Sequence, residues 1–268
     1  FALSEGPQRG WTTPLIVVSG LGGLVLLAAF VVVELRTAQP MVRLRLLGNR
    51  LFRSTLTVSM LGSAGFIGAL FLLPLFLQEA RGTSALTAGL ATMPEAIGVV
   101  LSTQVVARIY PRVGPRRLMA SGLVLVAVTV GLLGFVGAET NLWVVRVLMF
   151  FIGVGMAYVF LPNQAASMAT ISRAETGGAS MLMSVQRQLG AAVGVALLST
   201  VLSVKGPFRV VDGVQVPNLD AYHTAFFVAA GLALIGAFAA LLVPDADAAV
   251  TMRRGRARQP VPAPAPAD

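Results

Sequence analysis

The sequence has no cysteine and a single histidine, His223, among its 268 residues. Without cysteine there is no disulfide framework, no thiolate metal site and no cysteine nucleophile. One histidine cannot build a multi-histidine metal or haem site. We therefore expect no metal site and no cofactor.

Charged residues are also scarce, at 12% against the roughly one quarter usual in soluble proteins. Hydrophobic residues make up 56% of the chain, and its mean hydropathy is +0.82. A soluble domain of this composition could not cover its apolar surface. The composition therefore excludes a cytosolic enzyme and a disordered protein, and it indicates a chain embedded in membrane lipid.

Seven apolar runs are long enough to cross a bilayer, which takes about 20 helical residues. None of them alternates with a period of two, so barrel strands are not expected. A helix satisfies its own backbone in lipid, so we expect seven transmembrane helices. The runs cover residues 11–33, 54–78, 83–107, 118–138, 142–171, 177–204 and 222–243.

The net charge of +9 would suggest a nucleic-acid partner in a soluble protein. Here most basic residues lie in short segments between apolar runs, as in the cytoplasmic loops of membrane proteins, so we expect no nucleic-acid partner. The segments predicted to be outside hold only Arg9, Arg81, Lys205 and Arg209. The segments predicted to be cytoplasmic hold Arg36, Arg43, Arg45, Arg50, Arg53, Arg108, Arg112, Arg116, Arg117, Arg173, Arg253, Arg254, Arg256 and Arg258. We expect the amino end outside the cell and the carboxyl end in the cytoplasm of a multi-pass plasma-membrane (cell inner-membrane) protein.

The two ends of the chain differ in composition. Phe1 is not a methionine and no signal peptide follows it, so we expect that an upstream part is missing. Residues 244–268 are rich in Ala, Pro and Arg and are expected to be a disordered cytoplasmic tail.

Gly190 and Gly194 form a GxxxG pattern that allows two helix backbones to approach closely. No phosphate-binding glycine motif supports an ATP-driven pump.

Three groups of segments resemble the fourteen-span drug:proton antiporters of the major facilitator superfamily. The first group is residues 11–14, 33–36 and 40–52, and the second is residues 73–78, 82–90 and 93–94. The third is residues 153–155, Pro162, and residues 177–180 and 186–194. Each segment alone is weak evidence for the resemblance. The three groups together occur in the order and at the spacing typical of the family, over residues 11–243.

The resemblance implies an all-α membrane protein in which one central linker helix precedes a six-helix half-bundle. Residues 1–35 would be an outer loop and the last central helix, and residues 36–243 the carboxy-terminal bundle. The amino-terminal half of the transporter would be an absent partner. The implied activity is proton-coupled efflux of small lipophilic drugs or metabolites, with the substrate and protons as ligands, and not an enzymatic reaction.

The segment between the third and fourth runs resembles the superfamily's cytoplasmic gating loop. Arg112, Gly114, Arg116 and Arg117 fit its pattern, whereas Pro111 stands where the family has an aspartate. Without that acid, a plain positively charged turn is an equally good interpretation.

Three ionisable residues lie inside apolar runs. Glu95 falls near the middle of the third run, where a carboxylate is costly unless it is protonated, paired or hydrated. It is the candidate for proton coupling, the alternative being an inert structural carboxyl. Arg187 is predicted about 16 Å deep, near the level of Glu95, and could pair with it, line a polar cavity or serve a structural role. Arg146 is a weaker candidate, because its long side chain can reach the outer surface.

The second and fifth runs correspond to cavity-lining helices of the family. An aromatic and methionine-rich surface suits varied apolar cations, although such residues also face lipid or core. The polar candidates beside Arg187 and Arg146 are Gln188, Asn163 and Gln164. The aromatic and methionine candidates are Phe66, Phe71, Phe76, Met149, Phe150, Met156 and Tyr158.

Other classes of membrane protein remain open. A seven-helix receptor shares the predicted topology, but the retinal type needs a lysine in its last helix and the only lysine, Lys205, lies in a loop. An intramembrane aspartyl protease needs paired aspartates, and no aspartate falls in any run. An inactive truncated fragment is the further alternative.

Overall fold

A computed structural model describes residues 13–37, 44–211 and 214–253. Its main helices are α2 (Pro14–Arg36), α3 (Arg50–Leu75), α4 (Ala85–Val113), α5 (Pro115–Leu133), α6 (Leu142–Ser167), α7 (Thr176–Lys205), α8 (Leu219–Leu241) and α9 (Ala249–Arg253). The short helical segments are η1 (Leu44–Gly48), η2 (Phe76–Ala80) and η3 (Arg173–Glu175), of which η2 is a π-helix that continues α3.

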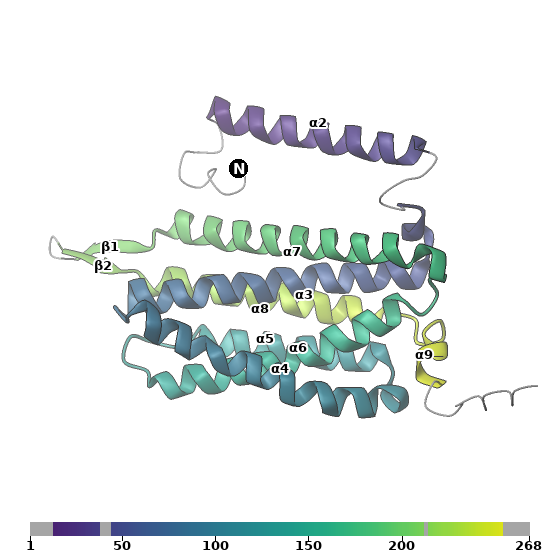
Figure 1. Cartoon of the computed structure of the whole chain (residues 1–268). Coiled ribbons are helices and arrows are strands. Elements are labelled where there is room, and N and C mark those ends of the chain that lie inside the picture. Colours follow the sequence, from purple (N-terminus) through teal and green to yellow (C-terminus); the bar gives the residue numbers. More distant parts are fainter. Residues whose placement is uncertain (1–12, 38–43, 212–213, 254–268) are drawn as a thin grey trace, which may run out of the picture.

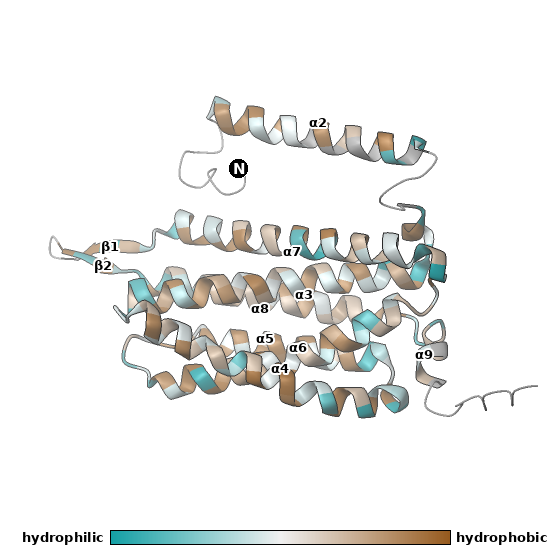
Figure 2. Ribbon diagram, in the orientation of Figure 1, coloured by the Kyte–Doolittle hydropathy of each residue, from teal (hydrophilic) through white to brown (hydrophobic). Residues whose placement is uncertain are grey.

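The long helices confirm the predicted all-α membrane fold. Within the described ranges, the six helices α3 to α8 are long and apolar enough to cross a membrane, and α2 is a further apolar helix of 23 residues. Figure 2 shows hydrophobic residues along most of their length, with hydrophilic residues gathered toward the helix ends and connecting segments. In Figure 1 the helices of the bundle run side by side, and α2 lies apart from them, opposite α7.

Side chains and glycines at the turns explain where the helices begin. The side chains of Asn49, Ser84 and Asn141 accept hydrogen bonds from backbone N–H groups in the first turns of α3, α4 and α6. Gly114 alone joins α4 to α5 and has a φ of 84°, a left-handed conformation that favours glycine. These local signals fix tight connections between neighbouring spans.

Glycines bring pairs of helices into backbone contact. A Cβ atom at Gly194 of α7 would lie 2.1 Å from the carbonyl oxygen of Ala64 in α3, and one at Gly190 would lie 2.6 Å from that of Met60. The GxxxG pattern therefore has α3 as its partner. Gly98 of α4 and Gly153 of α6 make an equally close contact between those two helices.

The core lies where α3, α5, α6 and α8 face one another. Phe76 packs edge-on against Tyr222 and Phe226 of α8, with ring centroids 5.6 and 5.9 Å apart. By contrast, only 17% of the most apolar stretch of α4 and 28% of that of α7 is buried, against 44–61% in the other four spans. α4 and α7 thus present the most apolar surface outward.

The carboxyl-terminal segment differs from its prediction. Residues 244–253 were expected to be disordered, but they turn back onto the bundle, and their last five residues form α9. Ala248 is fully buried, and the hydroxyl groups of Tyr110 and Thr251 are 2.7 Å apart. The prediction failed because apolar and hydroxyl groups at the helix ends give this short segment a surface to pack on. Residues 254–268 lie outside the described residues.

A small antiparallel hairpin was also not predicted. Strands β1 (Phe208–Val211) and β2 (Val214–Pro217) pair between α7 and α8, at the end of the bundle where α7 ends and α8 begins. The side chain of Asn218 donates to the carbonyl oxygens of Lys205 and Gly206, which ties the hairpin to the end of α7. The turn at its tip lies outside the described residues.

We predict that Gly194→Ala destabilises the bundle. The added methyl group would meet the Ala64 carbonyl at 2.1 Å, so α3 and α7 must separate. Such overpacking costs about 1–3 kcal/mol, and the midpoint of thermal unfolding in detergent should fall by several degrees. Gly231→Ala in α8 is the matched control, because nothing lies within 4 Å of its Cβ position. Equal midpoints for the two variants would refute the proposed role of the α3–α7 contact.

Candidate substrate cavity

A cavity of about 460 Å³ opens among α3, α4, α6 and α7. It lies in the half of the bundle where α3 and α7 begin and where α4 and α6 end. Its wall combines polar side chains with aromatic, methionine and aliphatic ones. The lining residues are Ser59, Val99, Thr103, Ala157, Phe160, Leu161, Asn163, Gln164, Ser180, Met183, Ser184 and Arg187.

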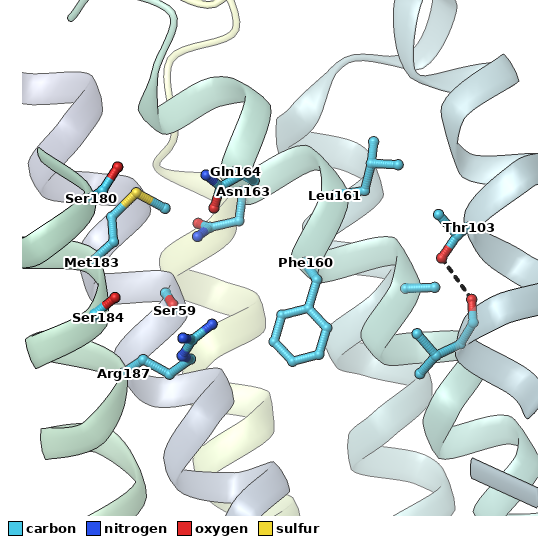
Figure 3. A pocket seen from close by; sticks show the side chains of 12 residues that line it. Ser59, Thr103, Phe160, Leu161, Asn163, Gln164, Ser180, Met183, Ser184 and Arg187 are labelled. Atoms are coloured by element: carbon cyan, nitrogen blue, oxygen red, sulfur yellow. Dashed lines mark hydrogen bonds between the residues drawn. The ribbon is translucent and has the colours of Figure 1, made fainter. Parts of the chain in front are cut away.

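Helical periodicity explains why these residues share a wall. On α7, Ser180, Ser184 and Arg187 are spaced by four and three residues, which places them on one face. Phe160 and Gln164 follow the same rule on α6. Figure 3 shows Arg187 extending from α7 toward Ser59 of α3, with Asn163 and Gln164 of α6 nearby.

Two amide side chains on the helices that form the cavity have buried atoms without hydrogen-bond partners. The Oδ1 atom of Asn163 is buried without one, and so are both amide atoms of Gln186, the residue before Arg187. A buried polar atom without a partner costs about 1–3 kcal/mol. A group that entered beside these amides and paired with them would therefore be stabilised. Gln186 was not among the sequence-predicted candidates, although an amide within an apolar run was a signal for it.

An aromatic pair supports the apolar wall. Phe160 lines the cavity, and its ring meets that of Phe66 edge-on, with centroids 6.1 Å apart. Phe66 itself is buried behind Phe160. The sequence predicted Phe66 at the cavity and missed Phe160, because the run alone does not show which face of the helix points inward.

The structure brings only part of the predicted set together. Arg187, Asn163 and Gln164 line the cavity, whereas Gln188, one position further along α7, is exposed outside it. Met149 and Met156 are spaced by seven residues on a face of α6 that packs into the core. The remaining aromatic candidates also lie elsewhere: Phe71 is 41% exposed, Phe76 is in the core, Phe150 meets Phe151 edge-on, and Tyr158 packs in a cluster with Val106 and Tyr110.

Arg146 lies away from the cavity. Its guanidinium carbon is 4.7 Å from the ring centroid of Trp143, one turn earlier on α6 and near the start of that helix. A cation over an indole ring is a stabilising arrangement. The contact accounts for Arg146 without a role at the cavity.

Glu95 is partly buried on α4, one turn before Val99 on the stripe that continues to Thr103. It does not line the cavity. Throughout the described ranges, no hydrogen bond or ion pair joins its carboxylate to Arg187, so the pairing considered from the sequence does not form. Its backbone carbonyl instead touches Gly153 of α6. The two charged groups occur at separate positions on neighbouring helices.

The predicted gating-loop residues surround the turn between α4 and α5. Arg112, Arg116 and Arg117 are exposed, and Gly114 is buried beneath the carboxyl-terminal segment. Asp245 Oδ1 accepts a hydrogen bond of 3.0 Å from the backbone N–H of Arg116. Since Gly114 has no side chain to cap α5, Asp245 performs the capping from a distant part of the sequence. An acid is thus present at this loop although Pro111 occupies the expected position.

The sequence is similar to one protein family and to several known proteins. The family model of the Major Facilitator Superfamily matches residues 6–195 and 112–265. The chain is 29% identical to a multidrug resistance protein B homolog of Mycobacterium tuberculosis over 76% of this chain and 38% of that protein. It is 29% identical to the puromycin resistance protein pur8 of Streptomyces alboniger (91% and 50%) and 25% identical to the lincomycin resistance protein LmrB of Listeria monocytogenes (92% and 54%). The chain thus spans about half the length of the relatives it matches.

We predict that Asp245→Ala loosens the carboxyl-terminal segment. Loss of a capping carboxylate costs about 1 kcal/mol, which corresponds to roughly fivefold faster local opening. Amide hydrogen exchange of residues 245–253 should therefore accelerate, while exchange in the core of α3 should stay unchanged. Asp247→Ala is the matched control, because Asp247 is exposed on the same segment. Equal exchange rates in both variants would show that Asp245 does not hold α9 in place.

Proposed function

Because the chain belongs to the Major Facilitator Superfamily, we propose that it forms one helix bundle of a secondary transporter that exports small lipophilic compounds in exchange for protons. The observation that carries the proposal is a cavity lined by one arginine and two amides, set among apolar spanning helices. Polar groups in that setting are costly and commonly mark a transport pathway. The multidrug, puromycin and lincomycin resistance named for its relatives supports a drug-like substrate.

The cavity wall suits an amphipathic compound. Phe160, Leu161 and Met183 offer apolar and polarisable surface, whereas Arg187 and Gln164 offer hydrogen bonds. Binding pockets for small molecules commonly combine a mainly apolar lining with a few polar groups that orient the ligand. Methionine adapts its shape to different ligands, which fits export of more than one compound.

Glu95 is the proposed proton-coupling residue. It is a partly buried carboxyl on α4, one turn from the cavity stripe, and no described residue pairs with it. A carboxyl within the membrane is favoured as its neutral acid and is ionised when water or a cation reaches it. Exposure to one side at a time would then link proton uptake to export.

A second helix bundle is the proposed partner. Transporters of this kind bind substrate at the interface of two repeats, and the chain spans about half the length of its relatives. The outward faces of α4 and α7 carry regularly spaced apolar side chains suited to such an interface. They are Met93, Ile97, Leu101 and Val105 on α4, and Met181, Val185, Leu189, Val193 and Leu197 on α7.

The proposed proton role predicts that Glu95→Gln abolishes coupled export. In the transporter containing both bundles, the amide mimics the protonated acid and cannot release a proton. We expect proton-driven efflux in membrane vesicles to fall at least tenfold, and substrate binding to persist without its pH dependence. Glu139→Gln, at an exposed position near the end of the helices, should leave efflux unchanged. Wild-type efflux with unchanged pH dependence in Glu95→Gln would assign the proton site to another residue.

The proposed orientation places the carboxyl end in the cytoplasm. Because this chain has no cysteine, a cysteine introduced into it is its only thiol and reports on the side where it lies. Val210→Cys in the exposed hairpin strand should react with a membrane-impermeant maleimide in intact cells, and Arg117→Cys should react only after permeabilisation. The reverse pattern would invert the topology.

A further inference from the structure

A second cavity, of about 350 Å³, lies between the beginning of α3 and the end of α8. It shares no lining residue with the substrate cavity. Its wall is formed by Arg50, Arg53, Ser54, Thr57, Ala239 and Leu242. Both helices span the membrane, so the cavity lies at the depth of the lipid headgroups, at the end of the bundle that carries most of the basic residues.

The polar side of this cavity is cationic and not neutralised by the protein. Arg50 and Arg53 are three residues apart, so they share one face of the first turn of α3. In the described part of the chain neither guanidinium forms an ion pair or a hydrogen bond, and no acidic residue lines the cavity. The positive end of the α3 dipole adds to the attraction for an anion.

The guanidinium groups are the available hydrogen-bond donors. Ser54 donates its hydroxyl proton to the carbonyl oxygen of Leu51, at 2.9 Å, and Thr57 donates to that of Arg53, at 3.1 Å. Both hydroxyl protons are therefore used within α3. Arginine offers a planar fork of donors that matches the oxygens of a phosphate group. A phosphate that bridged Arg50 and Arg53 would satisfy both.

The other side of the cavity is apolar and continues along α8. Leu242 is 75% exposed and Phe238, one turn earlier, is 69% exposed. Ile235 continues this face toward the middle of the membrane and is also exposed. A ligand that fits both sides must join an anionic head to a hydrocarbon chain, which a free phosphate ion does not do.

We infer that this cavity binds an anionic phospholipid, with its phosphate between Arg50 and Arg53 and an acyl chain along Leu242, Phe238 and Ile235. The site joins the first turn of α3 to the last turn of α8, so the bound lipid links the two helices at their cytoplasmic ends. Basic pockets between membrane helices on this side commonly hold anionic headgroups. This inference does not depend on the transported substrate or on proton coupling.

Native mass spectrometry of the purified protein tests the inference, with dioleoyl phosphatidylglycerol and dioleoyl phosphatidylcholine as probes. Wild-type protein should retain phosphatidylglycerol in preference to phosphatidylcholine. Arg50→Gln/Arg53→Gln should lower its apparent affinity for phosphatidylglycerol roughly tenfold. The matched control is Arg45→Gln/Arg173→Gln, which removes the same charge from exposed positions at the same end of the bundle. It should bind phosphatidylglycerol as the wild type does.

The apolar half of the site has its own test. Leu242→Asn retains both arginines and should weaken phosphatidylglycerol binding severalfold, because the acyl chain loses its contact. Inorganic phosphate at millimolar concentration should not displace the lipid. Equal loss of lipid in the two double variants would indicate general attraction to a basic surface and overturn the inference. Displacement by inorganic phosphate, or unchanged binding in Arg50→Gln/Arg53→Gln and Leu242→Asn, would also overturn it.

Discussion

The architecture depends on close backbone contacts between helices that lipid does not push together. In a membrane the hydrophobic effect does not drive helices together, because lipid tails are as apolar as the side chains. Close packing at small residues and dispersion contacts must therefore stabilise the bundle. Gly190 and Gly194 bring α7 against α3, and Gly98 and Gly153 bring α4 against α6. These two pairs also form the four walls of the candidate cavity. The position of Arg187 opposite Ser59 and Asn163 therefore follows from the glycine contacts.

A polar group among apolar helices loses its hydration, and contacts with other groups of the protein partly compensate for that loss. Arg146 rests on Trp143 and Asp245 caps α5, so each of these charged residues has a structural contact. Asn163 and Gln186 retain buried amide atoms without partners, and Glu95 has no paired group in the described chain. Of these groups, Asn163 lines the candidate cavity, Gln186 precedes the lining residue Arg187, and Glu95 lies one turn before the lining residue Val99. That contrast supports the proposal that substrate binds at this cavity and that the proton site lies beside it.

The carboxyl-terminal segment and the basic cavity give the end of the bundle where α3 begins and α8 ends two further connections. The carboxyl-terminal segment, residues 244–253, joins the end of α4 to the beginning of α5 through Asp245 and, in α9, Thr251. The proposed lipid would join α3 to α8 on another side. Transport by rocking of one bundle against another requires each bundle to move as a rigid unit. Contacts that fasten helix ends serve that requirement without occupying the cavity.

The sequence determined the membrane class, the helical runs and the resemblance to a transporter family. Bilayer thickness and backbone hydrogen bonding require apolar helical runs of about 20 residues, and such runs are visible in the sequence itself. It also identified Arg187, Asn163 and Gln164, since polar residues in apolar runs are visible without a structure. Only the tertiary structure decided which helix faces point inward: it placed Phe160 at the cavity, Met149 and Met156 in the core and Glu95 apart from Arg187. The physical reason is that a uniformly apolar helix has no periodicity to mark its inner face. Contacts between the glycines of one helix and the backbone of another fix how each helix is rotated about its axis. The residues in contact are far apart in the chain.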